Sequence, residues 1–342
     1  MHEAKPDLAA ENHRAQAAGP SPSPPLSPSP PLSPSPTARE WPQRIFIGPD
    51  GLRPGWRLFV YLAMAVVLFL VLSSFEPLIA EGGSGRLWRN MLLEAVLAVS
   101  CLLPAYVMGA IEKRPFASYG LRPRRAASGL FAVGVVWGIL ALSALMLLLW
   151  LVGVFSYGSL RLNGTHILKF GLFWGVFFLW VGVFEEFTFR GYTQFTLSQW
   201  IGFWPAAGVL SFLFGALHLW GNVGESALGS LCAALIGLFF CFTLRRTGSL
   251  WFAVGMHASW DWSESYLYSV PDSGGTTVGH LLNSSFHGSR WLTGGTVGPE
   301  GSVLVFVVIA ASWAAFDRIY PGTPFAAGGR TLPPQPISLR KS

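Results

Sequence analysis

The most informative stretch of the sequence is LFWGVFFLWVGVFEEFTFRGYTQFTL, residues 172–197. It is apolar up to Phe184 and then carries Glu185, Glu186 and Arg190 among aromatic residues. About 20 apolar residues let a helix span a bilayer, and a charge at the centre of such a helix costs about 3 kcal/mol. The stretch therefore predicts a membrane-spanning helix whose charged side chains need a specific reason to be there.

The composition of the whole chain supports a membrane protein. Of the 342 residues, 51% are hydrophobic and only 12% are charged, whereas a soluble domain carries about 25% charged residues. This small number of charges cannot cover a water-exposed surface, which excludes a soluble protein. A nucleic-acid partner is excluded with it. The three cysteines lie in apolar stretches, which argues against a disulfide framework and against a cysteine-rich zinc site.

The apolar runs predict an all-α, multi-pass membrane protein with about eight spanning helices. They are expected near residues 57–78, 89–111, 128–154, 172–197, 203–221, 227–244, 249–269 and 301–317. If the N-terminus is cytoplasmic, eighteen Lys and Arg residues fall on the cytoplasmic side and five on the other. Cytoplasmic loops carry an excess of positive charge. We therefore expect both termini in the cytoplasm.

The sequence divides into a membrane domain and two tails. Residues 1–42 are polar, and their Ser-Pro and Pro-Pro-Leu repeats cannot bury a core, so this segment is expected to be a disordered cytoplasmic tail or a ligand for a proline-binding module. The membrane domain is expected over residues 43–320. A short cytoplasmic tail is expected over residues 321–342.

Further ionisable residues occur in three predicted spans. Glu186 and Arg190 are four residues apart and can pair on one helix face, which leaves Glu185 without a local cation and suited to act as an acid or a base. His218 lies in the fifth span, and His257 and Asp261 lie one turn apart in the seventh. Each group also has a structural alternative. The Glu186–Arg190 pair could be a salt bridge at a helix end, His218 could be a packing residue, and His257 and Asp261 could form a hydrogen bond with no role in catalysis.

The depths of these groups agree if the fourth span continues past Arg190 to about Leu197. At about 1.5 Å of rise per residue, Glu185, His218 and the His257–Asp261 pair then fall in one layer of the membrane. No serine or cysteine nucleophile with a histidine partner competes with them. A carboxylate that activates water is therefore the predicted chemistry.

The motifs Glu185-Glu186-x-x-x-Arg190, Phe214-x-x-x-His218 and His257-x-x-x-Asp261, in this order, resemble the CPBP family of intramembrane proteases. This family, also called the CAAX-protease and bacteriocin-processing or Abi family, includes the Rce1-type prenyl-protein endopeptidases. The resemblance covers about residues 170–268. It implies an intramembrane endopeptidase that acts on a peptide or protein substrate entering from the lipid bilayer.

By motif match, Glu185 would activate water, with Glu186 and Arg190 in support, and His218 and His257 would hold the water, the oxyanion or a metal. The last motif position is often Asn, whose amide can donate to an oxyanion, but here it is Asp261. A carboxylate suits a metal ligand or a histidine partner better. A divalent metal such as zinc on His218, His257 and Asp261 is the cofactor that such a set would hold.

Two other classes of function remain open for the sequence. A non-catalytic scaffold, such as a bacteriocin self-immunity protein, could use the same fold. A transporter would use the charges as a relay, but it predicts internal repeats, and none is evident. The short loops and the charge pattern predict a multi-pass protein of a bacterial plasma membrane, with no nucleic-acid partner.

Overall fold

The computed structural model describes residues 46–48, 51–75, 85–121, 129–222 and 224–322. The predicted tail at residues 1–42, and all but the first two residues of the one at 321–342, lie outside this part of the chain.

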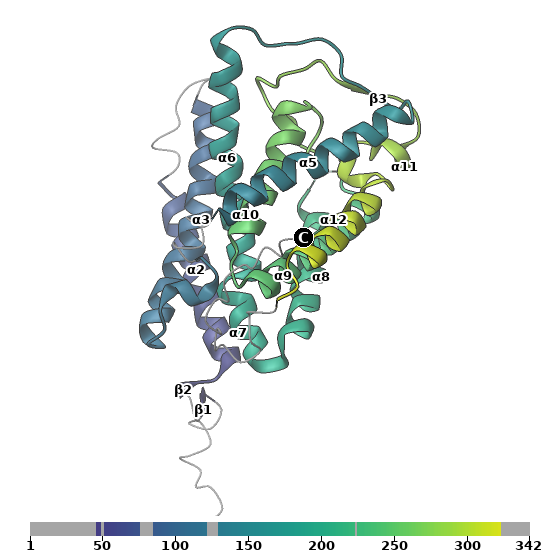
Figure 1. Cartoon of the computed structure of the whole chain (residues 1–342). Coiled ribbons are helices and arrows are strands. Elements are labelled where there is room, and N and C mark those ends of the chain that lie inside the picture. Colours follow the sequence, from purple (N-terminus) through teal and green to yellow (C-terminus); the bar gives the residue numbers. More distant parts are fainter. Residues whose placement is uncertain (1–45, 49–50, 76–84, 122–128, 223, 323–342) are drawn as a thin grey trace, which may run out of the picture. The chain divides into compact units, whose positions relative to one another are not determined.

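Helices dominate the described residues, which confirms the all-α class (Figure 1). They are α2 (Pro54–Ser73), α3 (Gly85–Ile111), α5 (Leu130–Leu151), α6 (Thr165–Arg190), α7 (Tyr192–Ile201), α8 (Phe203–Gly221), α9 (Ala227–Thr247), α10 (Trp251–Trp262), α11 (Arg290–Thr293) and α12 (Val305–Ile319). Short 3₁₀ turns occur at η2 (Phe116–Tyr119) and η4 (Pro299–Gly301), and one π-helical turn occurs at η3 (Ser263–Leu267). The strands are two-residue antiparallel pairs, β1 (Ile47–Gly48) with β2 (Gly51–Leu52), and β3 (Phe155–Ser156) with β4 (Ser285–Phe286).

Local sequence explains where several helices begin and end. Pro54 stands in the first turn of α2, where its missing N–H would have no helical partner in any case. Helix α9 begins after Ser226, whose hydroxyl accepts a hydrogen bond from the backbone N–H of Gly229. It ends at Gly248, which adopts the left-handed conformation typical of a helix C-terminus.

The predicted fourth span is longer than expected and is broken at Gly191. Helix α6 begins at Thr165 and ends at Arg190, and α7 then continues the helical run to Ile201. A Cβ at Gly191 would lie only 2.4 Å from the carbonyl oxygen of Phe187, so the break needs a residue without a side chain. The chain therefore stays helical past Arg190, as the depth argument requires.

The expected count of eight spanning helices is not confirmed. Six helical runs in the described residues are long and apolar enough to cross a membrane: 54–73, 87–111, 130–151, 165–201, 203–221 and 227–247. The seventh predicted span, 249–269, is instead the twelve-residue α10 followed by the π turn η3. The eighth, 301–317, is the fifteen-residue α12, which begins only after the 3₁₀ turn η4.

Contacts at their ends show that α10 and α12 nevertheless run between the two ends of the bundle. At the start of α10, the backbone N–H of Leu250 donates to the carbonyl of Gly120, in the connection between α3 and α5. Beyond η3 the chain reaches β4, which pairs with β3 after the other end of α5. Helix α12 returns from this side, and its Asp317 forms an ion pair with Arg246 in the last turn of α9.

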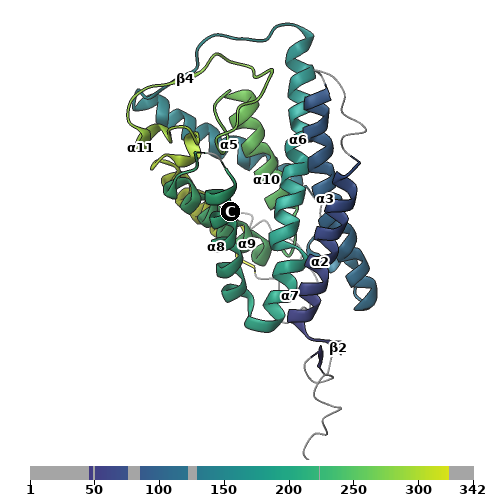
Figure 2. The ribbon, with the colours of Figure 1, turned by 180° about the vertical axis from the view of Figure 1, so that it is seen from behind.

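Helices α5 and α10 form the most extensive helix–helix contact in the described part of the chain (Figure 1). A Cβ at Gly134 would lie 2.2 Å from the carbonyl oxygen of Phe252, and one at Gly255 would lie 2.4 Å from that of Phe131. Small residues let helix backbones approach this closely in a membrane. On the other side α6 packs on both α10 and α3, and α2 packs on α3 and α7 (Figure 2). Helix α10 is thus held between α5 and α6.

We predict that Gly134→Ala lowers thermal stability, because the new methyl group would collide with the backbone of α10 and overpacking costs about 1–3 kcal/mol. Gly208→Ala in α8 is the matched control, since no atom outside its own helix backbone and chain neighbours lies within 4 Å of a Cβ there. Thermal unfolding of the detergent-solubilised protein, followed by tryptophan fluorescence, measures the difference. Equal melting temperatures for the two variants would contradict the close-packed interface.

Membrane topology gives a second prediction, because it depends on whether the short α10 crosses the bilayer. Reporter fusions at Ser118, between α3 and α5, should report the cytoplasm, as the positive charges predict. A fusion at Ser285 should report the opposite side, because β4 pairs with β3 beyond the far end of α5. Cytoplasmic signals from both positions would show that α10 does not cross.

Candidate active site

The residues singled out by the sequence come from three helices and meet at one cavity of about 580 Å³. Glu185 in α6, His218 in α8, and His257 and Asp261 in α10 all line it. Glu186 and Arg190 lie behind this surface and are almost completely inaccessible to solvent. The structure therefore brings all six residues into one region of the molecule, although they are spread over 77 positions of the chain.

Glu186 is the anchor of the arrangement. Its Oε1 accepts hydrogen bonds from Nη1 of Arg190, at 3.1 Å, and from Nδ1 of His257, at 2.8 Å. The i,i+4 pair expected within α6 is therefore present, and it extends to a histidine on α10. A buried carboxylate is tolerated when it is paired in this way.

The guanidinium of Arg190 is held by packing as well as by charge. It lies over the ring of Phe214, with its Cζ 4.4 Å from the ring centroid. A Cβ at Gly237 of α9 would lie 2.2 Å from Nη2 of Arg190, so this glycine makes room for the guanidinium. Arg190 therefore faces Glu186 and cannot also neutralise Glu185.

Glu185 is available for chemistry. Its side chain is 24% exposed, on the cavity, and its Oε2 is buried with no hydrogen-bond partner among the described residues. Nε2 of His257 lies 3.6 Å from this oxygen. A carboxylate that is poorly solvated and lacks a strong partner is suited to accept a proton.

His257 is oriented by its partners. Because Nδ1 donates to Glu186, the ring presents Nε2 to the cavity, 3.6 Å from Oε2 of Glu185 and 3.5 Å from Oδ2 of Asp261. The ring also stacks on Phe240, with the two planes 19° apart. These contacts leave it one orientation, with Nε2 between two carboxylates.

His218 presents the same nitrogen to the site. Its Nδ1 lies 2.8 Å from the carbonyl oxygen of Phe214, and a carbonyl oxygen can only accept, so Nδ1 carries the hydrogen. In the neutral ring, Nε2 is then the nitrogen that carries the lone pair. The ring packs against Phe214, which is also the ring beneath Arg190.

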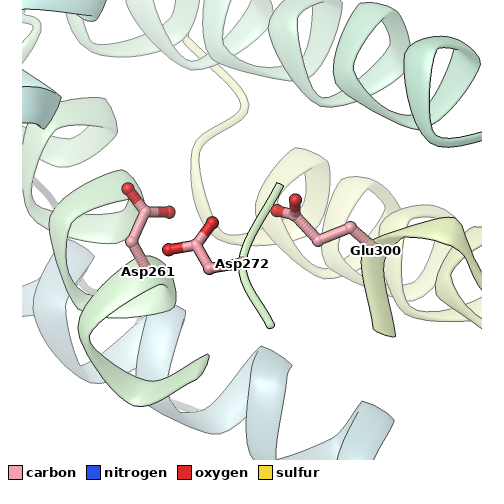
Figure 3. Close-up of side chains that lie close together, drawn as sticks. All are labelled: Asp261, Asp272 and Glu300. Carbon is pink, nitrogen blue, oxygen red and sulfur yellow. The ribbon is translucent and has the colours of Figure 1, made fainter. Parts of the chain in front are cut away.

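Three carboxylates that the motifs do not include also line the cavity: Glu225, Asp272 and Glu300. Carboxylate oxygens of Asp261, Asp272 and Glu300 all lie within 4.8 Å of one another (Figure 3). Removal from solvent, together with repulsion from Asp261 and Glu300, raises the pKa of Asp272 well above its ordinary value. The only signal in the sequence is that Asp272 and Glu300 are the sole acidic residues between positions 265 and 300.

The geometry bears on the expected metal set. Among the described residues, Asp261, Asp272 and Glu300 form the group of three or more possible ligands whose donor atoms lie this close together. His218 and His257 do not belong to it. A zinc ion on His218, His257 and Asp261 stays a prediction.

Comparison with known protein families gives a match to part of the chain. Residues 167–263 match the family described as type II CAAX prenyl endopeptidase Rce1-like. Searches among curated proteins and among solved structures give no match. The matching segment contains all three motifs and nearly coincides with the core expected at 170–268. The match confirms the resemblance drawn from the motifs: residues 167–263 of this multi-pass membrane protein match the Rce1-like family model.

Proposed function

We propose that the protein is an intramembrane endopeptidase of the CAAX-protease type, which hydrolyses a peptide bond with water activated by Glu185. The observation that carries this proposal is that the two adjacent glutamates have different surroundings. Glu186 is fully buried, and its Oε1 is bound to Arg190 and His257, whereas Glu185 lines the cavity and lies 3.6 Å from Nε2 of His257. A fixed ion pair behind a free carboxylate supports a site built around one base.

The proposed reaction uses the two histidines differently. Glu185 takes a proton from a water molecule in the cavity, and the oxygen attacks the carbonyl carbon of the substrate. The lone pair on Nε2 of His218 can hold the second hydrogen of that water. His257, which contacts three carboxylates, can carry a proton on Nε2 and donate a hydrogen bond to the oxyanion that develops, while keeping the proton.

Collapse of the tetrahedral intermediate completes the reaction. The C–N bond breaks, and the proton on Glu185 passes to the leaving amine. The substrate class follows from the family match, which favours a peptide that carries a prenyl group near the bond to be cleaved. The aromatic residues Trp174, Phe177 and Phe178 of α6 form an apolar wall of the cavity, which supports a substrate with an apolar part. We place the protein in a bacterial plasma membrane because its positive charges are concentrated on one side.

Glu185→Gln tests the base. The amide keeps the size of the side chain but cannot accept a proton, so cleavage of a prenylated CAAX-type peptide should fall by about 10²–10⁴. The melting temperature should be unchanged, because Glu185 has no strong partner to lose.

Glu186→Gln is the matched comparison for this test. It disrupts the buried ion pair with Arg190, which costs about 3–5 kcal/mol, and should lower stability together with activity. Full cleavage by the Glu185→Gln variant would end the protease assignment and favour the non-catalytic scaffold.

Asp261→Asn tests the remaining motif position. The amide can donate a hydrogen bond to the oxyanion, and it removes one negative charge beside Asp272 and Glu300. We expect cleavage to stay within about tenfold of the unsubstituted protein, whereas Asp261→Ala, which leaves no polar group at this position, should cost about 10²–10³ in turnover. Equal, severe loss in both variants, measured on the same peptide, would instead assign the carboxylate charge itself to the reaction.

A further inference from the structure

The carboxylates of Asp261, Asp272 and Glu300 come from three separate segments of the chain: α10, the loop after η3, and η4. Figure 3 shows the three side chains turned toward one another. Their closest oxygens lie within 4.8 Å of one another. Two oxygens bound to a calcium ion at about 2.3–2.6 Å are at most about twice that distance apart, so the spacing suits a shared cation of this size.

A fourth carboxylate borders this cluster and has an unsatisfied oxygen. Glu264 in η3 is completely buried, and its Oε1 has no hydrogen-bond partner among the described residues. Its Oε2 accepts from Nε1 of Trp260, at 3.0 Å, and the same N–H also donates to Oε1 of Glu300, at 3.1 Å. Because one donor serves both groups, the Glu264 carboxylate lies directly against that of Glu300.

The protein provides little positive charge to compensate this concentration of acid. Within the part of the chain that the structure describes, no lysine or arginine lines the cavity. The cationic contact of Asp261 is His257, at 3.5 Å. Asp272 and Glu300 accept hydrogen bonds from the hydroxyls of Ser265 and Ser273, but these are neutral. Buried or half-buried carboxylates at this density need a cation or a proton to be stable.

We propose that Asp261, Asp272 and Glu300 bind a hard divalent cation of the calcium class, with Glu264 as the buried acidic residue that supports the site from behind. All the donors are carboxylate oxygens, which prefer calcium, magnesium or manganese. Zinc prefers nitrogen and sulfur ligands, and neither occurs in this group. The irregular loop segments around Asp272 and Glu300 suit the flexible coordination of calcium better than the strict octahedron of magnesium.

The cation would tie the loop of residues 268–304 to α10. Apart from β4, the one-turn helix α11 and the 3₁₀ turn η4, this long segment has little regular structure of its own. The site would fix its position at the edge of the cavity and would cancel the charge behind His257. Its role is therefore structural, and it does not depend on the proposed peptidase activity.

The test uses the full-length protein in detergent after treatment with EDTA and dialysis. Addition of CaCl₂ should raise the melting temperature in a saturable way, because a ligand that binds only the folded state stabilises it. MgCl₂ should act more weakly, and isothermal titration calorimetry should give a stoichiometry of about one calcium ion per chain. Asp272→Asn and Glu300→Gln should each weaken calcium binding by at least tenfold.

Glu225→Gln is the matched control, because Glu225 lines the same cavity but lies outside the cluster. It should bind calcium as the unsubstituted protein does. The proposal is overturned if calorimetry detects no calcium binding, since the carboxylates would then be held neutral by protons. It is equally overturned if both cluster variants bind calcium unchanged, or if zinc binds in preference to calcium. Calorimetry on the unsubstituted protein decides the matter even if a variant fails to fold.

Discussion

The hydrogen bonds from Arg190 and His257 to the buried Glu186 are the interaction on which the site depends. A carboxylate without exposure to solvent must be paired, since an unpaired charge in the interior costs several kcal/mol. Glu186 and Arg190 lie on α6 and His257 on α10, so the pairing fixes the rotation of one helix against the other. Once His257 is held by Nδ1, its Nε2 has one direction left, toward Glu185 and Asp261.

Packing of the surrounding helices makes this pairing possible. Glycines on α5 and α10 let the two backbones approach, so α10 reaches deep enough to place His257 against α6. Gly182 gives the same access on the other face, since a Cβ there would lie 3.1 Å from the carbonyl oxygen of Val254. In a bilayer, where the hydrophobic effect does not drive helices together, such contacts carry the association. The glycines at these helix contacts therefore make the ion pairing between Glu186 and His257 possible.

Much of the site could be predicted from the sequence because its logic is local. The i,i+4 spacing predicted the Glu186–Arg190 pair, and the ionisable residues in apolar runs indicated which helices must meet. The lengths of α10 and α12 could not be predicted, because hydrophobicity does not reveal where a helix gives way to a π or 3₁₀ turn. Asp272 and Glu300 were missed for a similar reason. They lie in a loop without periodicity, and only the packing of that loop brings them to Asp261.

The cavity has two chemically different walls, and this difference bears on how hydrolysis can take place within a membrane. The aromatic residues of α6 form one part of the cavity lining, and the carboxylates of Asp261, Asp272 and Glu300 form another. Glu185 and His257 line the same cavity, so a substrate held by its apolar residues could present its peptide bond to them. Water is a reactant in the proposed chemistry and must enter a layer that otherwise excludes it. The acidic residues beside Glu185 would offer that entry under the proposed mechanism without opening the bundle to solvent.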